Sequence, residues 1–179
     1  MTDLTTLDGA LLFTTERLKC RRWEPTDEAG LYEVYSDPET ARYIGDGSPI
    51  SHEECKHWLQ VTATNYRNRG YGMFCLTQLD GSLAGFCGLV HPGQQIATEV
   101  KYAFHKSLWG KGLATEMLMA LVAHARSAYA ISTLIATVAP ENTPSQRVLR
   151  KAGFEFVEER LDADHQPERL FQIGPNELY

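Results

Sequence analysis

The stretch SLWGKGLATE, residues 107–116, could do chemistry although no acid or histidine lies between its two glycines. Gly110 and Gly112 flank Lys111 just before a run that predicts a helix. Peptide N–H groups at a helix start are unpaired and carry partial positive charge, which favours phosphate. Glycine lets a ligand approach the backbone closely, and the lysine adds local positive charge. The pattern indicates a phosphate-binding corner, and a plain turn that needs glycine only for its dihedral angles explains it as well.

Two familiar nucleotide-binding motifs do not fit this corner. A Walker A loop has serine or threonine after Gly-Lys and a glycine five residues earlier, but Gly112 and His105 occupy those positions. A Rossmann fingerprint needs glycine or alanine where Thr115 stands, and it normally lies in the first βαβ unit. A pyrophosphate-binding corner of another kind remains.

Composition narrows the class of protein. A net charge of −6 argues against a general nucleic-acid binder, which normally has a basic surplus. No segment approaches the roughly 18 to 20 apolar residues of a membrane span, and the N-terminus lacks the basic start of a secretory signal. Four widely spaced cysteines show no CxxC or paired-histidine pattern, which favours reduced thiols and no metal. We therefore expect a cytoplasmic protein with no membrane partner and no direct nucleic-acid partner.

The elements that must position the corner follow from apolar periodicity. Strand-like runs lie at 16–23, 72–79, 82–90, 97–105, 132–138, 154–160 and 168–173, and helical runs at 26–36, 51–69, 113–128 and 143–152. Asp80-Gly81 predicts a hairpin because such a turn needs a positive φ. This order of elements predicts an α/β or α+β domain with a mixed sheet.

Residue types at the helix ends predict where two of these helices begin and end. Ser51 and Glu54 form a capping-box pattern. Thr143 is the predicted N-cap of a later helix, with proline at the first helical position. That helix should end at Gly153 in a left-handed conformation.

Two blocks of sequence resemble one enzyme family. EVKYAFHKSLWGKGLATEM at 99–117 resembles the central motif of the GCN5-related N-acetyltransferase (GNAT) superfamily, most of all its ribosomal-protein (RimJ/RimL-type) branch. NTPSQRVLRKAGF at 142–154 resembles that branch's N-x-x-S-x-x-V-L-x-K-x-G-F segment. The match in element order implies a single acetyltransferase domain over 1–179 with a core at about 14–173. It also implies a mixed, mostly antiparallel sheet of about six to seven strands with splayed central strands, flanked by about four helices.

The resemblance implies acetyl-coenzyme A as cosubstrate and no metal. Amides at 110–115 would hold its pyrophosphate, and the strand ending at 102–105 would pair its backbone with the pantetheine arm. Core or sheet packing explains Tyr102 and Phe104 as well, holding of the loop after 132–138 explains Asn142, and surface exposure explains Arg147. The implied cofactor-binding residues are Tyr102, Ala103, Phe104, His105, Trp109, Gly110, Lys111, Gly112, Leu113, Ala114, Thr115, Asn142 and Arg147.

Acetyl transfer needs a neutral amine, donors for the developing oxyanion and help for the leaving thiolate. Many superfamily members have a tyrosine where Leu149 stands, and leucine cannot donate. The Rim-type branch implies a serine instead, which matches Ser145; a simple capping role explains that serine too. Glu99 matches the family's glutamate and is the predicted base, with a water relay or an ordinary edge carboxylate as alternatives.

The acceptor site is less well defined than the donor site. Arg42, Tyr43 and Trp58 are predicted wall residues, although surface exposure explains Arg42 and core packing explains Trp58. Lys101 departs from the branch's usual glycine and places a cation on the central strand. No cysteine lies in either motif, which favours direct attack in a ternary complex over an acetyl-cysteine route.

The predicted function is an acetyl-coenzyme A-dependent N-acetyltransferase acting on a primary amine, such as a protein N-terminal α-amine. A small amine or amino acid is the alternative acceptor. A non-catalytic acyl-coenzyme A-binding module is the alternative of another class. The sequence does not choose between a monomer and a dimer.

Overall fold

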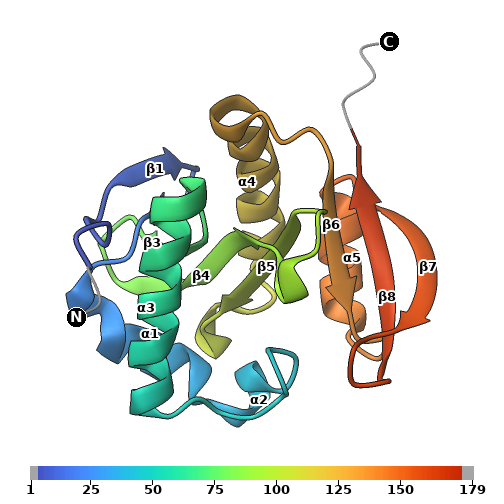
Figure 1. The fold of residues 1–179 in the computed structure, drawn as a ribbon, viewed down its shortest axis with the longest axis horizontal. Helices are drawn as coiled ribbons and strands as arrows, with labels where there is room; N and C mark the ends of the chain where they lie inside the picture. The colour runs from blue at the N-terminus through green and yellow to red at the C-terminus, as the bar shows by residue number, and fades with distance from the viewer. Residues whose placement is uncertain (1–3, 175–179) are drawn as a thin grey trace.

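The computed structural model describes residues 4–174, and all its strands belong to one sheet in the order β1-β2-β3-β4-β5-β6-β8-β7 (Figure 1). The strands are β1 (Leu11–Thr14), β2 (Leu18–Arg21), β3 (Met73–Gln78), β4 (Leu83–Val90), β5 (Glu99–Phe104), β6 (Leu134–Val138), β7 (Glu155–Leu161) and β8 (Pro167–Ile173). The α-helices are α1 (Glu28–Tyr35), α2 (Pro38–Ala41), α3 (His52–Arg69), α4 (Leu113–Tyr129) and α5 (Thr143–Lys151). Only β5 and β6 pair in parallel, so the predicted mixed, mostly antiparallel sheet is confirmed.

The described chain has one strand more than the largest predicted number, because the N-terminal region was interpreted wrongly. A single strand at 16–23 was expected, but Thr15 and Leu18 close a tight turn that separates β1 from β2. The amide of Leu18 also donates to Thr15 Oγ1 at 3.0 Å. The apolar run of β1 lacks the alternation that marks a strand, so the pattern missed it. The short helix α2 was missed too, and the Asp37 side chain caps it by accepting from the amide of Thr40 at 2.8 Å.

Most of the predicted turn and capping signals are confirmed. Ser51 and Glu54 form the capping box at the start of α3. Gly81 in the β3–β4 turn and Gly153 after α5 have φ of +91°. Thr143 as N-cap of α5 is wrong by one residue, because Asn142 holds that position and its Oδ1 accepts from the amide of Ser145 at 3.2 Å.

Helices cover both faces of the sheet. Helices α1 and α3 contact each other on one face, and α4 and α5 contact each other on the opposite face (Figure 1). The predicted apolar stripe of α4 is buried, with Leu118 and Leu121 fully inaccessible and Val122 nearly so. This burial fixes α4 against the sheet, and therefore fixes where its N-terminus lies.

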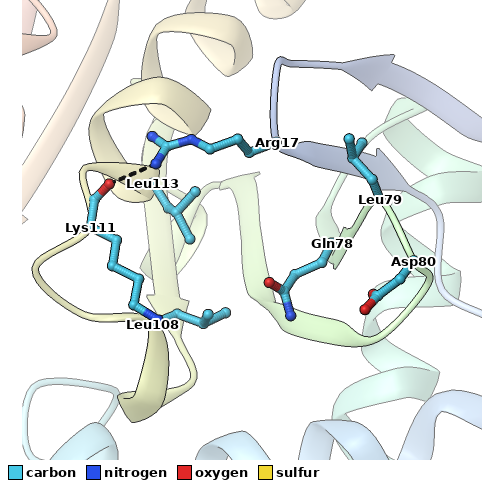
Figure 2. A pocket seen from close by; sticks show the side chains of 7 residues that line it. All are labelled: Arg17, Gln78, Leu79, Asp80, Leu108, Lys111 and Leu113. Carbon is cyan, nitrogen blue, oxygen red and sulfur yellow. Dashed lines mark hydrogen bonds between the residues drawn. The ribbon is translucent and has the colours of Figure 1, made fainter.

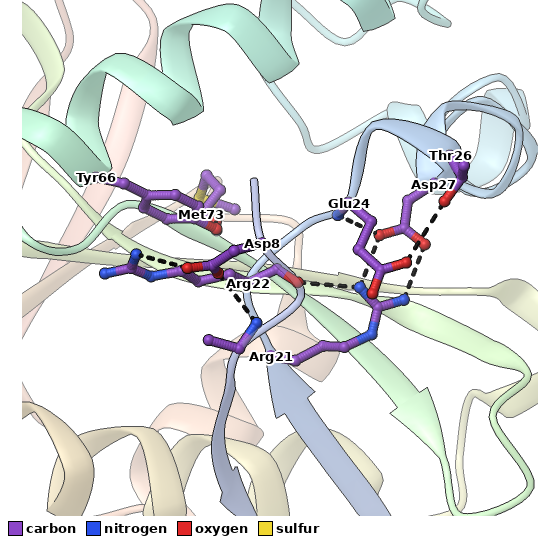
Figure 3. A network of polar contacts seen from close by, with 9 residues as sticks. Asp8, Arg21, Arg22, Glu24, Thr26, Asp27, Tyr66 and Met73 are labelled. Carbon is purple, nitrogen blue, oxygen red and sulfur yellow. Dashed lines mark hydrogen bonds and ion pairs between the residues drawn. The ribbon is translucent and has the colours of Figure 1, made fainter. Parts of the chain in front are cut away.

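A polar network ties β2 to the start of α1 (Figure 3). Arg21 donates to both carboxylate oxygens of Asp27, at 2.7 and 2.8 Å, and Asp27 also accepts from the amide of Glu24 at 2.7 Å. Its neighbour Arg22 pairs with Asp8 at 3.5 Å on the other side of the strand. These contacts hold β2 at a defined position, which matters for the β1–β2 turn described below.

The central strands β5 and β6 separate soon after they meet. They pair at Glu99 and Ile135, where the amide of Ile135 donates to the carbonyl of Thr98 at 3.0 Å. Within residues 4–174 no further pairing joins them, while β5 stays paired with β4 as far as Phe104 and β6 stays paired with β8. The predicted splay of the central strands is thus present, and it leaves backbone groups of β5 available along one edge.

Candidate active site

The glycine corner lies between β5 and α4. Gly110 and Gly112 have φ of +74° and +78°, in the left-handed region that favours glycine. Gly112 is the N-cap of α4 and supplies no side-chain hydrogen bond to the first turn. The amides of that turn therefore lack the partner that serine, threonine, asparagine or aspartate usually provides. Such a helix start suits an anion supplied by a ligand.

Other residues fix the corner in place. The indole Nε1 of Trp109 donates to the carbonyl of Phe104 at 2.8 Å, which joins the loop to the last residue of β5. The guanidinium of Arg17 donates to the carbonyl of Lys111 at 2.9 Å. We predicted Trp109 as a cofactor contact and missed its bond to the strand, and we did not identify Arg17 at all. Neither bond leaves a signal in local sequence spacing.

An open groove of about 400 Å³ adjoins the corner on the side of the β3–β4 turn (Figure 2). Leu108 and Leu113 are buried apolar residues of its lining, while Arg17 and Lys111 bring cationic groups. Its lining residues are Arg17, Gln78, Leu79, Asp80, Leu108, Lys111 and Leu113. Two predicted cofactor residues, Lys111 and Leu113, therefore line a concave surface beside the helix start.

Beyond the point where β5 and β6 pair, the two strands diverge, and we call the opening between them the slot. Tyr102 of β5 and Ser145 of α5 meet across it. Their hydroxyl oxygens lie 2.9 Å apart. Burial raises the pKa of Tyr102 to about 12, and the hydrogen bond with Ser145 lowers it by less. The phenol is therefore protonated at neutral pH and can donate to Ser145, which leaves the serine proton free for another acceptor. The side chain of Asn142 caps α5, so Ser145 contributes only its amide to the cap and keeps its hydroxyl free of that role.

Glu99 is buried at 2% exposure where β5 and β6 meet. Its carboxylate accepts from the hydroxyl of Thr137 on β6 and from Gln95 Nε2 at 3.1 Å, and it forms an ion pair with Lys101. Lys101 also donates to Thr137 Oγ1 at 3.0 Å, and 42% of its side chain stays exposed. Because side chains alternate along a strand, Glu99 and Lys101 project from the face of β5 opposite to Tyr102. Glu99 and Tyr102 thus approach the slot from opposite faces of the sheet.

The other residues predicted to bind the cofactor differ in how deeply they are buried. Ala103, Phe104 and Leu113 are buried, while His105, Ala114 and Thr115 are half-buried and Arg147 is exposed. Beside Ser145, the buried Gln146 donates to the carbonyl of Pro140 at 2.8 Å and so holds the loop before α5. Sequence reasoning missed Gln146, because a glutamine inside a helical run gives no sign of burial.

The predicted acceptor residues have different surroundings. Arg42 and Tyr43 are exposed just after α2, with the guanidinium 5.2 Å from the centre of the tyrosine ring. Trp58 packs edge-on against Trp23 and Phe86, with ring centres 5.4 and 5.7 Å away. The acceptor roles of all three residues stay predictions.

The described part of the chain holds neither a candidate metal site nor a candidate membrane-spanning helix. Within residues 4–174 no group of three or more histidine, cysteine, aspartate or glutamate side chains could hold a metal ion. No helix in the same range is both long and apolar enough to cross a membrane. The four cysteines are buried free thiols, and the sulfur atoms of Cys20 and Cys87 lie 3.8 Å apart.

Known proteins share this sequence and this fold. A family model for the acetyltransferase (GNAT) domain matches residues 17–155. The L-2,4-diaminobutyric acid acetyltransferase of Streptomyces avermitilis is 33% identical over 188 aligned residues, which cover 94% of each chain.

Solved structures agree at the level of the fold. A GNAT-family acetyltransferase from Bacillus anthracis superposes with a TM-score of 0.77 at 24% identity, covering 92% of this chain and 98% of that one. RimL, described as a ribosomal alpha-N-protein acetyltransferase in complex with coenzyme A, gives a TM-score of 0.79 at 17% identity, covering 93% of this chain and 98% of that one. Since the family model spans most of the sequence and includes both the corner and Ser145, the chain belongs to the GNAT acetyltransferase family.

Proposed function

We propose that this protein transfers the acetyl group of acetyl-coenzyme A directly to a primary amine in a ternary complex. The observation that carries the proposal is the arrangement along β5. The uncapped start of α4 follows the C-terminal end of β5, and Glu99 is the first residue at the N-terminal end of the strand. Between them the edge that faces β6 is unpaired, and the hydroxyl of Ser145 reaches Tyr102 across it. Acetyl-coenzyme A carries the matching groups in the same order: a pyrophosphate for the helix start, an extended amide-bearing arm for the unpaired edge, and a thioester for the reacting side chains.

The donor site fits the ligand through backbone groups. The amides of the first turn of α4 would hold the pyrophosphate, and Gly110 and Gly112 would let it approach closely. The free edge of β5 would hydrogen-bond the amides of the pantetheine arm in the manner of an added strand. Arg147 and Asn142 are assigned to the cofactor as well, although Asn142 Oδ1 already serves as a helix cap.

The reaction needs one bond to form, one to break and one proton to move. The neutral amine attacks the thioester carbonyl, the carbon–sulfur bond breaks, and the proton lost by the amine balances the one gained by the thiolate. We assign Glu99 as the group that receives the amine proton, directly or through water. We assign Ser145 as the hydrogen-bond donor to the leaving thiolate, with Tyr102 donating to Ser145 behind it. The thiolate of a thiol with a pKa of ~8.5 leaves readily, so one such donor is sufficient.

The acceptor is either a protein N-terminal α-amine or a small molecule. RimL, whose fold is similar, is named for a protein acceptor, whereas the diaminobutyric acid acetyltransferase is named for an amino acid. One contact favours the amino acid: the half-exposed ammonium of Lys101 lies beside Glu99. A free amino acid carries a carboxylate that can pair with this ammonium, but a peptide N-terminus has its first carboxyl locked in an amide.

The test is release of free thiol from acetyl-coenzyme A with a panel of acceptors. The panel contains basic and neutral peptides, free amino acids, diamines, and each amino acid as its carboxamide. Thiol release with any of these supports the enzyme. Tight binding of coenzyme A without release across the whole panel supports a non-catalytic acyl-coenzyme A-binding module instead.

A further inference from the structure

Three residues from distant parts of the chain meet above the glycine corner, and we call them the Arg17 clamp: Thr15, Arg17 and Glu116. Glu116 lies in the first turn of α4, and its carboxylate accepts from the hydroxyl of Thr15 at 2.5 Å and from the amide of Arg17 at 2.9 Å. The Nε of Arg17 donates to the other oxygen at 2.7 Å, and its Nη2 lies 2.7 Å from the same atom. The clamp thereby joins the β1–β2 turn to the start of the helix.

The clamp has a second arm that holds the corner itself. Arg17 Nη1 donates to the carbonyl of Lys111, which lies between the two glycines (Figure 2). All three guanidinium nitrogens are thus committed to protein atoms. Arg17 is therefore placed to hold the corner through the carbonyl of Lys111.

The corner needs such a restraint because little else packs on it. A side chain at Gly110 would meet no atom within 4 Å, and one at Gly112 would meet only Arg17 Nη2, at 3.7 Å. Glycines in open space lose much conformational freedom when they are ordered. A loop that is already ordered before its ligand arrives loses less on binding, and this raises affinity.

The clamp also controls charge. A carboxylate in the first turn of a helix suits the helix dipole, but Glu116 lies in the same turn whose amides are assigned to the pyrophosphate. Burial opposes ionisation of Glu116, but hydrogen bonds from Thr15 and Arg17 outweigh it and lower its pKa. The carboxylate is therefore charged at neutral pH, and only Arg17 lies close enough to cancel that charge among its described partners.

We propose that Arg17 is a positioning residue for the donor's pyrophosphate: it orders the Gly110–Gly112 corner through Lys111 and neutralises Glu116. The proposal rests on the proposed function, since it assumes that the corner binds coenzyme A. It predicts that loss of Arg17 acts on the pyrophosphate half of the donor and leaves the pantetheine half and the chemical step unaffected.

The test compares donors with and without a pyrophosphate. Arg17→Ala should weaken coenzyme A binding, measured by calorimetry, by about tenfold, because it removes charge-assisted hydrogen bonds and leaves Glu116 unpaired. The value of kcat at saturating acetyl-coenzyme A should stay within about twofold, and so should kcat/KM for S-acetylpantetheine, which lacks the pyrophosphate. Arg17→Lys keeps the charge but not the forked geometry, so it should fall between wild type and Arg17→Ala.

A double variant separates the effect of the unpaired Glu116 charge from the effect on the order of the corner. Adding Glu116→Gln to Arg17→Ala removes the unpaired charge and should recover part of the lost affinity, whereas Glu116→Gln alone should change it by less than about threefold. The matched control is Arg160→Ala, which breaks a similar pair with Glu168 at 2.8 Å on the β7–β8 hairpin and should leave both donors unaffected.

The outcomes are distinct. Wild-type protein that binds no coenzyme A contradicts the proposed function. Binding that is the same in wild type, Arg17→Ala and Arg17→Lys contradicts the clamp alone. Equal losses with acetyl-coenzyme A and S-acetylpantetheine contradict it as well, because they indicate damage to the fold and no specific effect on the pyrophosphate.

Discussion

The two ends of the slot differ in the kind of chemical group that is assigned to the ligand. At the corner, the groups assigned to the ligand are peptide amides, and the side chains around them restrain the loop, as Arg17 and Trp109 do. At the reacting end the important groups are side chains, with Tyr102 and Ser145 on one side and Glu99 on the other.

This contrast indicates how each end should respond to mutation. Peptide amides are present whatever the side chain, so the corner should tolerate a change of residue type but not a change of backbone angle. A hydroxyl or a carboxylate disappears with its side chain, so the reacting end should tolerate little change in chemistry although its backbone is ordinary. The predictions below test that division, beginning with the largest expected effect.

Gly112→Val should weaken coenzyme A binding by about a hundredfold, because a β-branched residue at a left-handed φ is strained by roughly 1–3 kcal/mol and its side chain blocks the approach to the amides. Calorimetric titration measures the loss. Gly70→Val is the matched control, since Gly70 has a φ of +80° and a side chain there would meet no atom within 4 Å. It should destabilise the fold by a similar amount and leave the affinity unchanged. Unchanged affinity in Gly112→Val would contradict the assignment of the corner.

Ser145→Ala should lower kcat by about tenfold or more and leave coenzyme A affinity within about twofold, because one donor to the leaving thiolate is lost. The helix cap survives, since the serine contributes only its amide to Asn142. Steady-state kinetics and direct titration separate the two effects. Thr143→Ala, an exposed change on the same helix, is the control. Full activity in Ser145→Ala would leave the serine with a structural role only.

A double-mutant cycle sharpens this test. Tyr102→Phe alone should lower kcat by about threefold to fivefold, since it acts through Ser145. In the Ser145→Ala background the same change should have almost no further effect. Additive losses would show that the two hydroxyls act independently, contrary to the proposed relay.

Local patterns predicted much of this molecule, and what they missed has a common cause. The α4 helix, the Ser51 capping box and the glycine corner are signalled by neighbours within a few residues, so spacing alone was sufficient. The Tyr102–Ser145 bond joins residues 43 apart, and the Arg17–Glu116 pair joins residues 99 apart. Such contacts depend on how the sheet is ordered and on how helices pack on it, which no short window of sequence contains.

One error arose within a short window. Asn142 and Thr143 are adjacent, and both residue types suit an N-cap, so the start of α5 was misplaced by one residue. The structure shows that Asn142 Oδ1 accepts from the amide of Ser145, so the serine enters the cap only through its backbone.

Lys101→Met tests whether the reacting end also selects the acceptor. If the acceptor is an amino acid, kcat/KM for it should fall by about tenfold, while kcat/KM for its carboxamide should change by less than about threefold. Kinetics with matched acid and amide acceptors give the ratio. Lys106→Met, which removes an exposed lysine paired with Glu39 at 2.6 Å, is the control. Equal losses for acid and amide would mean that Lys101 serves only to hold Glu99.

The smallest expected effect is on alkaline stability and comes from Tyr102. Its pKa of about 12 lies above the ordinary value of 10.0, so between these pH values the unfolded chain loses the phenol proton while the folded chain keeps it. The free energy of unfolding should therefore fall as pH rises from about 10 to about 12, through this group among others.

Tyr102→Phe should flatten that fall, and urea unfolding at a series of pH values measures it. The control is Ser145→Ala, which removes the same hydrogen bond but keeps the phenol, so the fall should persist or become steeper. If both variants follow the wild-type curve, Tyr102 ionises equally well in the folded and unfolded chains. The phenol would still be protonated at neutral pH, so that outcome would contradict the raised pKa of Tyr102 and leave its hydrogen bond with Ser145 in place.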